Sequence, residues 1–207
     1  MNEKAMYKIS YGLFILTTTE SGHDCGCVIN TAMQVTSQPN QISIAVNKMN
    51  HTHDMILKSG NFNVSTLSEE ADFDIFKHFG FQCGRDVDKF AGYADFKRAE
   101  NGIPYITKGT NSFISAEVVQ TVDLGTHTLF IGKVTDMDVL NSVPSATYDY
   151  YHAHIKPKPE KVAAPAGKTL WRCGICGYIY EGEELPADFI CPICKHDASV
   201  FVKVVNE

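Results

Sequence analysis

Two matched cysteine pairs near the C-terminus constrain this chain more than any other feature of its sequence. They are Cys173-Gly-Ile-Cys176 and Cys191-Pro-Ile-Cys194, with fourteen residues between them. This spacing is close to the pattern in which two Cys-x-x-Cys turns bind one metal ion tetrahedrally. A segment of roughly forty residues cannot bury enough apolar surface to fold by itself, so a bound metal is expected to hold it together. The spacing alone leaves zinc and iron open.

The residues around the two pairs favour iron. The first pair is followed by Gly-Tyr-Ile-Tyr (177–180), and the second is preceded by Leu-Pro-Ala-Asp-Phe (185–189). This segment resembles rubredoxin, the electron carrier in which four cysteines hold one iron, and the resemblance implies the same role for all four cysteines here. A structural zinc ribbon is the alternative. Glycine after a cysteine pair tolerates the positive φ that turns backbone N–H groups toward the sulfurs. We expect a compact aromatic core, formed by Trp171, Tyr178, Tyr180, Phe189 and Phe201.

A change in composition separates this segment from the rest of the chain. Residues 155–168 read IKPKPEKVAAPAGK, with three prolines and no aromatic residue. This composition predicts a semi-extended linker, which at about 3.1 Å per residue could reach on the order of 40 Å. We therefore expect an N-terminal domain over 1–154, a linker over 155–168 and a metal domain over 169–207. Such a linker would allow the metal domain to reach a site on its own subunit or on a neighbouring one.

The overall composition excludes several classes of function. The chain has 207 residues and a formal net charge of −6. It lacks a basic cluster interleaved with aromatic residues, which argues against nucleic-acid binding. Its longest apolar runs are too short to span a membrane. The N-terminus lacks the continuous apolar stretch of a signal peptide, so we expect a cytoplasmic protein.

Seven cysteines in a chain of this kind favour metal binding and thiols over disulfides. Cys25, Cys27 and Cys83 remain once the metal ligands are assigned. We interpret all three as ordinary thiols. Partial burial beside a cofactor is the alternative for Cys27 and Cys83.

The N-terminal domain has mostly strand patterns. Apolar, β-branched or alternating runs predict strands over 12–19, 41–46, 113–122 and 129–134. Short helices are expected over 52–58, stopped by Gly60, and over 68–79, with Ser68 as N-cap and Gly80 at the end. Many short strands with few helices predict a mostly β fold with short helices, arranged as a barrel with helical excursions.

Two polar segments flank the strand expected over 41–46. Residues 30–37 (NTAMQVTS) form a run of amide and hydroxyl donors before the strand, and residues 47–53 (NKMNHTH) follow it and open a helix. A helix N-terminus with hydroxyls and a lysine is suited to binding phosphate, whereas polar loops beside a strand are more often simply solvated. The chain contains no Gly-x-Gly-x-x-Gly or Walker motif, so a nucleotide would be held in a non-Rossmann manner.

Four stretches of this domain carry a resemblance to a known family. They are residues 30–39, residues 47–52 with 62–67, residues 79–90 (FGFQCGRDVDKF), and Gly125-Thr126-His127 with residues 131–134. Together they resemble the flavin reductase-like family, whose FMN-binding split β-barrel also occurs in flavoredoxins. The resemblance covers nearly all of residues 5–155. It also shows two departures, because Thr126 stands where the family usually has an acid and Cys83 where serine is common.

The resemblance implies an FMN site. Residues 31–34 would line the isoalloxazine largely with backbone groups, residues 36–37 would bond the ribityl chain and phosphate, and Asn47, Lys48 and Thr52 would complete the phosphate site. The residues expected to bind the cofactor are Asn30, Thr31, Ala32, Met33, Gln34, Thr36, Ser37, Asn47, Lys48, Thr52, Phe79, Gly80 and Lys89.

The same resemblance suggests an electron-transfer function. His127 is the candidate catalytic residue, placed where the family receives a nicotinamide, and Arg85 would lie close to the flavin. The two domains together resemble the fused high-molecular-weight rubredoxins. This implies transfer from NAD(P)H through FMN to one iron, and on to a partner such as a flavodiiron oxygen or nitric oxide reductase. Alternatives are a flavoredoxin-like carrier reduced by another protein, and an active barrel with a zinc ribbon for docking. The family also implies a homodimer.

Overall fold

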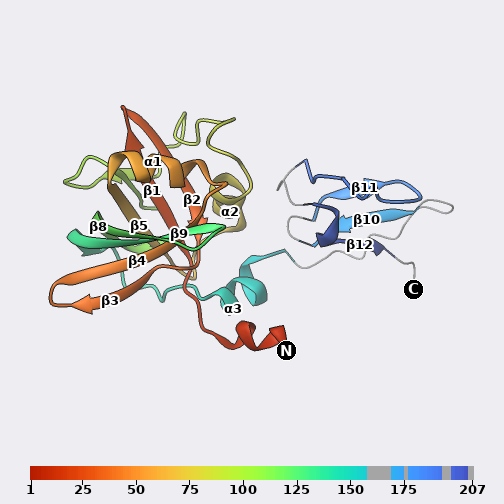
Figure 1. The fold of residues 1–207 in the computed structure, drawn as a ribbon, viewed down its shortest axis with the longest axis horizontal. Helices are drawn as coiled ribbons and strands as arrows, with labels where there is room; N and C mark the ends of the chain where they lie inside the picture. Colours follow the sequence, from red (N-terminus) through yellow and green to blue (C-terminus); the bar gives the residue numbers. More distant parts are fainter. Residues whose placement is uncertain (158–168, 175–176, 193–196, 205–207) are drawn as a thin grey trace. The chain divides into compact units, whose positions relative to one another are not determined.

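A computed structural model describes residues 1–157, 169–174, 177–192 and 197–204 of the chain (Figure 1). The chain divides into two compact units, Met1–Lys156 and Pro157–Glu207. Most of the linker expected over 155–168 lies outside the described residues, and so do Cys176 and Cys194. Within the described residues, none of the helices combines the length and apolar character needed to cross a bilayer.

The N-terminal unit is built on a seven-stranded antiparallel sheet (Figure 1). Its strand order is β2-β1-β5-β8-β9-β4-β3, and a separate two-stranded sheet pairs β6 with β7. The strands are β1 Phe14–Glu20, β2 His23–Ile29, β3 Met33–Ser37, β4 Asn40–Asn47, β5 Asn61–Leu67, β6 Phe96–Arg98, β7 Pro104–Ile106, β8 Thr110–Asp123 and β9 His127–Val139.

The short connection Asn30–Ala32 explains why this sheet curls. It joins β2 to β3, which are the two edge strands of the seven-stranded sheet. Three residues cannot cross a flat sheet of that width, so the two edges must approach each other. Register shifts between β8 and β9, at Ser115/Ala116 and Val118/Gln120, add local bending. The prediction of a mostly β fold with short helices, organised as a barrel, is confirmed.

Strand β1 separates two apolar clusters because its side chains alternate between the two faces of the sheet. Leu16 packs in the first cluster and Ile15 in the second, and both are fully buried. The first cluster contains Leu16, Cys27, Ile29, Ile42, Ile44, Val46, Ile56, Phe62, Val64, Ala116 and Phe130. The second contains Leu13, Ile15, Leu67, Ala71, Ile75, Phe76, Phe79, Ile106, Ala146 and Tyr151.

Helix α1 (His51–Ser59) matches the helix expected over 52–58. Gly60 has φ of 70° and its N–H donates to Ile56 O, so this glycine ends the helix in the left-handed conformation as predicted. The remaining short elements of this unit are η1 Glu3–Lys8, α2 Phe73–Gly80, α3 Tyr148–Tyr150 and the π-helical turn η2 Tyr151–Ile155.

The start of α2 was predicted wrongly. The helix begins at Phe73, and its N-cap is Asp72, whose carboxylate accepts the Ile75 N–H at 3.1 Å. Ser68 instead lies in an isolated bridge to Ser145, with its own N–H donating to Gly109 O at 2.9 Å. Tertiary pairing therefore overrides the local capping signal at Ser68. The predicted end at Gly80 is confirmed.

Two strands were not anticipated in the polar N-terminal region. Residues 33–37, interpreted as a polar loop, form β3, which pairs with β4 through a bulge between Gln34 and Thr36. Strand β2 was also missed, since its sequence His-Asp-Cys-Gly-Cys-Val-Ile alternates poorly. The strands expected over 12–19, 41–46, 113–122 and 129–134 are present as β1, β4, β8 and β9.

The C-terminal unit contains a three-stranded sheet in the order β11-β10-β12. Its elements are β10 Leu170–Cys173, β11 Ile179–Glu181, the short η3 turn Ala198–Val200 and β12 Phe201–Val204. The predicted aromatic core is confirmed, because Trp171, Tyr178, Tyr180 and Phe189 pack against a cluster that contains Phe201. The Phe189 ring lies 4.7 Å from that of Tyr180 and 5.4 Å from that of Phe201.

Candidate functional site

Strand β4 and helix α1 meet at the segment predicted to bind phosphate. Asn47 ends β4, and its side-chain oxygen accepts the Met49 N–H at 2.9 Å. Asn50 is the N-cap of α1, but its side chain makes no capping hydrogen bond. The first N–H groups of α1 therefore lack this usual partner, and they lie at the positive end of the helix dipole. This terminus is suited to binding an anion.

The turn between β8 and β9 brings His127 to the same place. His127 pairs with Asn47 in the β4–β9 register, and the Lys48 N–H donates to Thr126 O at 3.0 Å. The side chain of Thr126 contacts His127 Nδ1 at 2.9 Å. Three predicted site residues, Asn47, Lys48 and His127, are thus neighbours.

Asp123 is a residue of this group that the sequence analysis missed. Its carboxylate accepts hydrogen bonds from Lys48 Nζ and from the Gly125 N–H, both at 2.7 Å. The Lys48 hydrogen bond, followed by the Gly125 one, lowers the pKa of Asp123. The signal in the sequence was an acid at the end of a predicted strand, just before the Gly-Thr-His turn. The pair holds the Lys48 ammonium at the end of β8.

Arg85 lies against the same helix terminus. Its guanidinium donates to Met49 O at 2.8 Å and to Asp54 Oδ2 at 2.6 Å. The hydrogen bond to Asp54 raises the pKa of Arg85, while bonds from His53 first and Arg85 second lower the pKa of Asp54. A second cation therefore stands near Lys48, on the loop that follows α2.

Thr52 and Lys89 were predicted to bind the cofactor, but their side chains point into the protein. Thr52 is buried, with its hydroxyl 3.4 Å from Cys25 Sγ, so only its backbone is suited to an anion. Lys89 is 2% exposed, and its ammonium donates to Gly26 O at 2.8 Å and to Phe79 O at 2.9 Å. Burial lowers the pKa of Lys89. The geometry gives Lys89 a structural role, holding its loop and the end of α2 on β2.

The end of α2 lies on strand β2. Phe79 is buried, and a side chain at Gly26 would meet its ring at 3.3 Å. Gly80 is exposed, and a side chain there would meet Val28 at 3.3 Å. Phe79 and Gly80 therefore pack against successive positions of β2, the strand that leads to Asn30.

The predicted run Asn30–Ser37 divides into an inner and an outer part. Residues 30–32 are half-buried, and the Thr31 hydroxyl donates to Ala45 O at 2.7 Å and accepts the Ala45 N–H at 3.2 Å. Residues 33–37 form β3, which is exposed along its whole length. Gln34 bonds Asn40 at 3.0 Å, and the Thr36 hydroxyl donates to Pro39 O. Thr31 therefore anchors the connection between the two edges of the sheet.

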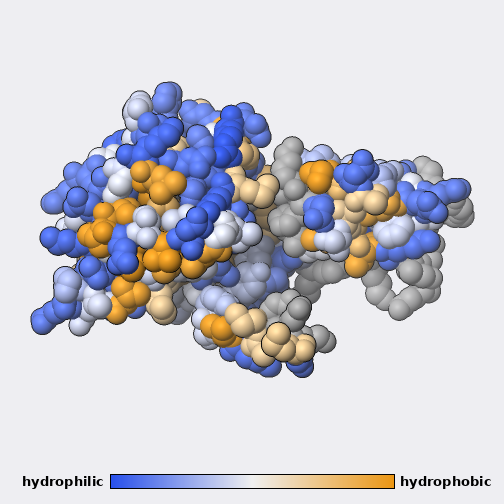
Figure 2. All heavy atoms as spheres, in the orientation of Figure 1, coloured by the Kyte–Doolittle hydropathy of each residue, from blue (hydrophilic) through white to orange (hydrophobic). Residues whose placement is uncertain are grey.

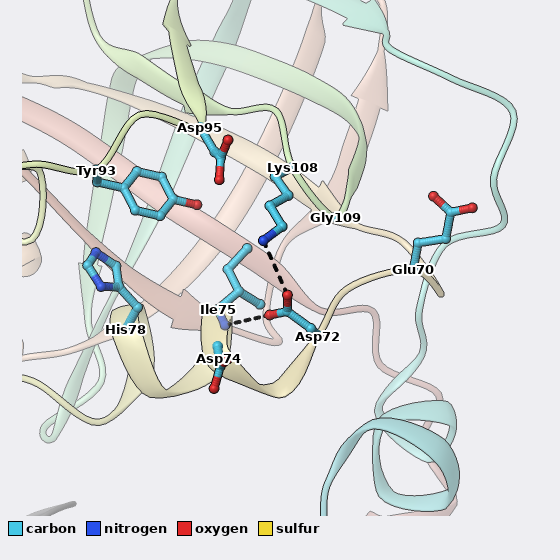
Figure 3. Close-up of a pocket in the computed structure, with 9 residues that line it drawn as sticks. All are labelled: Glu70, Asp72, Asp74, Ile75, His78, Tyr93, Asp95, Lys108 and Gly109. Carbon is cyan, nitrogen blue, oxygen red and sulfur yellow. Dashed lines mark hydrogen bonds and ion pairs between the residues drawn. The ribbon is translucent and has the colours of Figure 1, made fainter.

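Two hollows lie elsewhere on the N-terminal unit. The larger, of about 510 Å³, is bounded by β2, α1 and the loop 84–91, and includes Cys25, His51 and Arg85. The smaller, of about 180 Å³, is acidic (Figure 3). There Asp72 lies between Lys108, at 3.4 Å, and the start of α2. Arg85, expected close to the flavin, lines the larger hollow, whereas the residues predicted to bind the cofactor line neither of the two.

In the C-terminal unit, two of the predicted metal ligands share one buried cluster. Cys173 ends β10 at 1% exposure, Cys191 is fully buried, and both pack with Phe201. Gly177, with φ of 80°, donates its N–H to Cys173 O at 3.0 Å, which forms the expected tight turn. Two thiol side chains in a small aromatic core fit half of a four-thiolate site. The other two predicted ligands, Cys176 and Cys194, lie outside the described residues.

Comparisons with known proteins identify both units. The model of the flavin reductase like domain matches residues 6–158. The chain belongs to the flavin reductase-like family. A second model, the rubredoxin-like domain of rubrerythrin, matches residues 171–202. This flavin reductase-like chain therefore carries a C-terminal rubredoxin-like domain, and the fold prediction of a split barrel followed by such a domain is confirmed.

Individual relatives agree with this assignment. The chain is 36% identical to the high molecular weight rubredoxin of Moorella thermoacetica, covering 99% of this chain and 100% of the relative. It is 40% identical to the ferric-chelate reductase (NAD(P)H) of Archaeoglobus fulgidus, covering 79% of this chain and 96% of the relative. The fold matches the flavin reductase HpaC complexed with NADP⁺, with a TM-score of 0.61, 22% identity, and coverage of 70% of this chain and 90% of that one. These relatives indicate that the chain is an oxidoreductase.

Proposed function

We propose that this chain passes electrons from NAD(P)H through bound FMN to one iron ion, and on to a protein acceptor such as a flavodiiron oxygen or nitric oxide reductase. The observation that carries the proposal is the joining, in one chain, of a flavin reductase-like barrel to a unit that buries Cys173 and Cys191 together. When bound, the flavin would supply two-electron chemistry and the iron one-electron chemistry. The protein would then serve as a converter between a hydride donor and a one-electron chain.

The terminus of α1 is the proposed phosphate site. It offers N–H groups that the Asn50 side chain does not cap, together with the cations of Lys48 and Arg85. Charge-assisted hydrogen bonds of this kind are about twice as strong as neutral ones. Asp123 and Asp54 hold the two cations in place, so a phosphate would bind to a preformed pair. Because the barrel belongs to the flavin reductase-like family, which includes FMN-binding proteins, we propose FMN as the flavin.

The connection Asn30–Ala32 is the proposed contact for the flavin ring. Because Thr31 bonds both backbone groups of Ala45, the peptide groups of this connection are fixed relative to β4. Rigid peptide groups can donate to and accept from a planar heterocycle at low entropic cost. Phe79 and Gly80 pack against β2, the strand that precedes this connection.

His127 is the proposed nicotinamide contact. Thr126 engages its Nδ1, which sets the ring orientation and leaves Nε2 as the atom available to a ligand. Thr126 offers this ring a neutral hydroxyl rather than a carboxylate. This neutral partner also favours a second candidate function, a flavoredoxin-like carrier reduced by another protein.

Cys173, Cys176, Cys191 and Cys194 are the proposed iron ligands. The tight turn at Gly177 directs its N–H to Cys173 O, and the Cys173 N–H donates to Tyr178 O at 2.8 Å. These backbone bonds fix the first cysteine at the end of β10. Its burial with Phe201 would keep water from the metal, which is one of the factors that set a reduction potential.

We further propose that the barrel acts as a homodimer. Strand β3 is exposed on both faces, and apolar side chains gather across the face of the N-terminal unit shown in Figure 2. Large exposed apolar patches mark interaction surfaces. The exposed apolar residues on the barrel strands and α1 are Met33, Val35, Leu57, Val119, Val122, Met137 and Val139. A second copy covering β3 would also convert the open surface at residues 33–37 into a walled site.

Anaerobic stopped-flow spectroscopy with metal analysis tests the function. We expect one flavin and one iron per chain, with NADH bleaching the flavin bands first and the iron bands second. A His127→Ala variant should slow reduction by NADH and leave reduction by a chemical donor such as dithionite unchanged. If NADH bleaches neither chromophore while a reduced protein donor does, the carrier function is correct instead. One zinc and no iron per chain would refute the electron-transfer role of the C-terminal unit.

A further inference from the structure

Three cysteines other than the predicted metal ligands lie on or near the loop that carries Arg85. Cys25 and Cys27 are buried on β2, and Cys83 is half-exposed at the start of the loop 83–90. Burial lowers the pKa of Lys89, and the Cys27, Cys25 and Cys83 thiols act against that effect, which places all three near the Lys89 ammonium. The proposed electron transfer does not use these thiols.

The close approach is between Cys25 and the residue after Cys83. A Cβ on Gly84 would lie 2.5 Å from Cys25 Sγ, so the Gly84 Cα is within about 4 Å of that sulfur, given a carbon–carbon bond of about 1.5 Å. Consecutive Cα atoms are about 3.8 Å apart, which places the Cys83 Cα within about 8 Å of the same sulfur. In a disulfide the S–S bond is about 2.05 Å, so each Cα lies within roughly 5 Å of the partner's sulfur. A loop shift of about 3 Å would therefore close the gap.

We expect this loop to shift at Cys83, because its bonds to neighbouring elements are made by residues 85 and 89. Residues 81–92 form turns and bends rather than a helix or strand. Arg85 ties the loop to α1, and Lys89 ties it to Gly26 on β2. Between Arg85 and the end of α2, the Cys83 carbonyl accepts the N–H groups of Asp86 and Val87 at 3.0 and 3.1 Å.

Cys25 is the buried thiol whose sulfur lies near Gly84, the residue after Cys83. It lines the larger hollow together with Gly84 and Arg85, whereas Cys27 does not. Cys25 and Cys27 lie on the same face of β2, about 6.6 Å apart along the strand. The Thr52 hydroxyl is a hydrogen-bond partner of both sulfurs.

We propose that a peroxide oxidises Cys83 and that Cys83 then forms a disulfide with Cys25, making this loop a redox switch. In the first step the Cys83 thiolate attacks the peroxide, forming an S–O bond and breaking the O–O bond, with water as the product after protonation. In the second step the Cys25 sulfur attacks the sulfenic sulfur, forming the S–S bond and breaking the S–O bond, and the departing hydroxide takes the Cys25 thiol proton to leave as a second water. Each sulfur gives up one electron of the two that reduce the peroxide.

The switch would act on the cofactor through Arg85, a consequence that rests on the proposed function. Drawing Cys83 toward Cys25 displaces Arg85, which then loses its bonds to Met49 O and Asp54 at the start of α1. The proposed phosphate site would lose one of its two cations. We therefore expect oxidation to weaken flavin retention about tenfold.

Peptide mapping of the full-length protein tests the disulfide directly. The protein is treated with a series of hydrogen peroxide concentrations, alkylated and digested without reductant, and the linked peptides are identified by mass spectrometry. We expect a Cys25–Cys83 linked pair in the native chain and in the matched control Cys27→Ala, and none in Cys83→Ser. A native chain in which Cys83 is oxidised while Cys25 is still fully alkylated overturns the proposal, and so does a Cys25–Cys27 link.

A parallel measurement separates the switch from the proposed function. Flavin retention is followed by dialysis of the same oxidised samples. Faster loss from the native chain than from Cys83→Ser supports the coupling to the cofactor site, and equal loss from both overturns it. If the unoxidised protein binds no flavin, the proposed function fails, while the mass-spectrometric result still decides the disulfide.

Discussion

The N-terminal unit buries Phe62, Phe130 and Ile44 completely within a cluster of eleven residues, whereas the core cluster described in the C-terminal unit consists of Cys173, Cys191 and Phe201. Two of those three residues are predicted metal ligands. We therefore expect the barrel to be stabilised by apolar burial, and the small unit to be stabilised by metal binding through its sulfurs. If so, one chain contains two units of different stability, and each can be perturbed separately.

Metal removal should have the largest effect, and only on the small unit. Structural metal binding contributes on the order of 10 kcal/mol to the folding of domains of this kind. We expect the metal-free protein, or a Cys191→Ala variant, to unfold in the C-terminal unit while the barrel keeps its melting temperature. Trp171 is the single tryptophan of the chain, so its fluorescence reports on this unit alone.

Cys83→Ser is the matched control for this prediction, since it removes a cysteine outside the metal centre. It should leave the Trp171 emission unchanged. A native-like Trp171 spectrum in the metal-free protein would show that the small unit does not need its metal.

Truncation of a buried barrel side chain should destabilise the barrel and leave the C-terminal unit unchanged. Phe62 is fully buried, and Phe→Ala substitutions in cores cost about 3–5 kcal/mol. Phe62→Ala should lower the denaturant midpoint of the barrel, followed by far-ultraviolet circular dichroism, with no change in Trp171 fluorescence at low denaturant. Leu57→Ala, at an exposed position of α1, should change the midpoint little. Equal losses from the two variants would contradict the assigned core.

Alkaline pH should weaken the barrel through Cys27. Burial raises the pKa of this thiol to about 11 from 9.0. The folded state thus keeps a proton that the unfolded state loses, so this contribution is complete below pH 9 and disappears as the pH rises to about 11. A shift of two units corresponds to about 3 kcal/mol. In Cys27→Ala, urea unfolding should show a smaller decline in stability between pH 9 and 11, and parallel curves for the two proteins would exclude this role.

The smallest expected effect concerns the cofactor. Lys48→Met removes one of two cations at the start of α1 and should weaken FMN binding about tenfold, or about 1.4 kcal/mol. Lys58→Met, at the other end of the same helix, is the matched control and should bind FMN normally. Fluorescence titration of the flavin-free protein measures both. Similar affinities for the two variants would place the phosphate elsewhere.

Much of this fold could be predicted because local patterns and tertiary structure agree. Alternation over 41–46 gave β4, Gly60 gave the end of α1, and the spacing of the cysteines gave the small unit. Ser68 shows where local signals mislead, since its N–H bonds Gly109 O from a distant segment. No local pattern contains such a pairing.

The membership of the site stays a prediction, and the structure adds the orientations of its side chains. The resemblance to flavin reductases pointed to Lys48 and His127, which the β4–β9 register brings together. It also pointed to Lys89, whose side chain turns inward to two carbonyl oxygens. Asp123, the partner of Lys48, belongs to no motif. The direction of a side chain depends on the folded backbone around it, and a sequence motif carries no information about that backbone.

The two edges of the barrel sheet differ in a way that affects solubility. The β2 edge is covered by the end of α2 and by the buried Lys89 side chain, whereas β3 is exposed along its whole length and carries no charged residue. An uncharged open edge is a template for pairing with further chains. Preparations of this protein should therefore aggregate through β3 whenever that strand is left uncovered, and Val35→Lys should act as a gatekeeper that keeps concentrated samples clear.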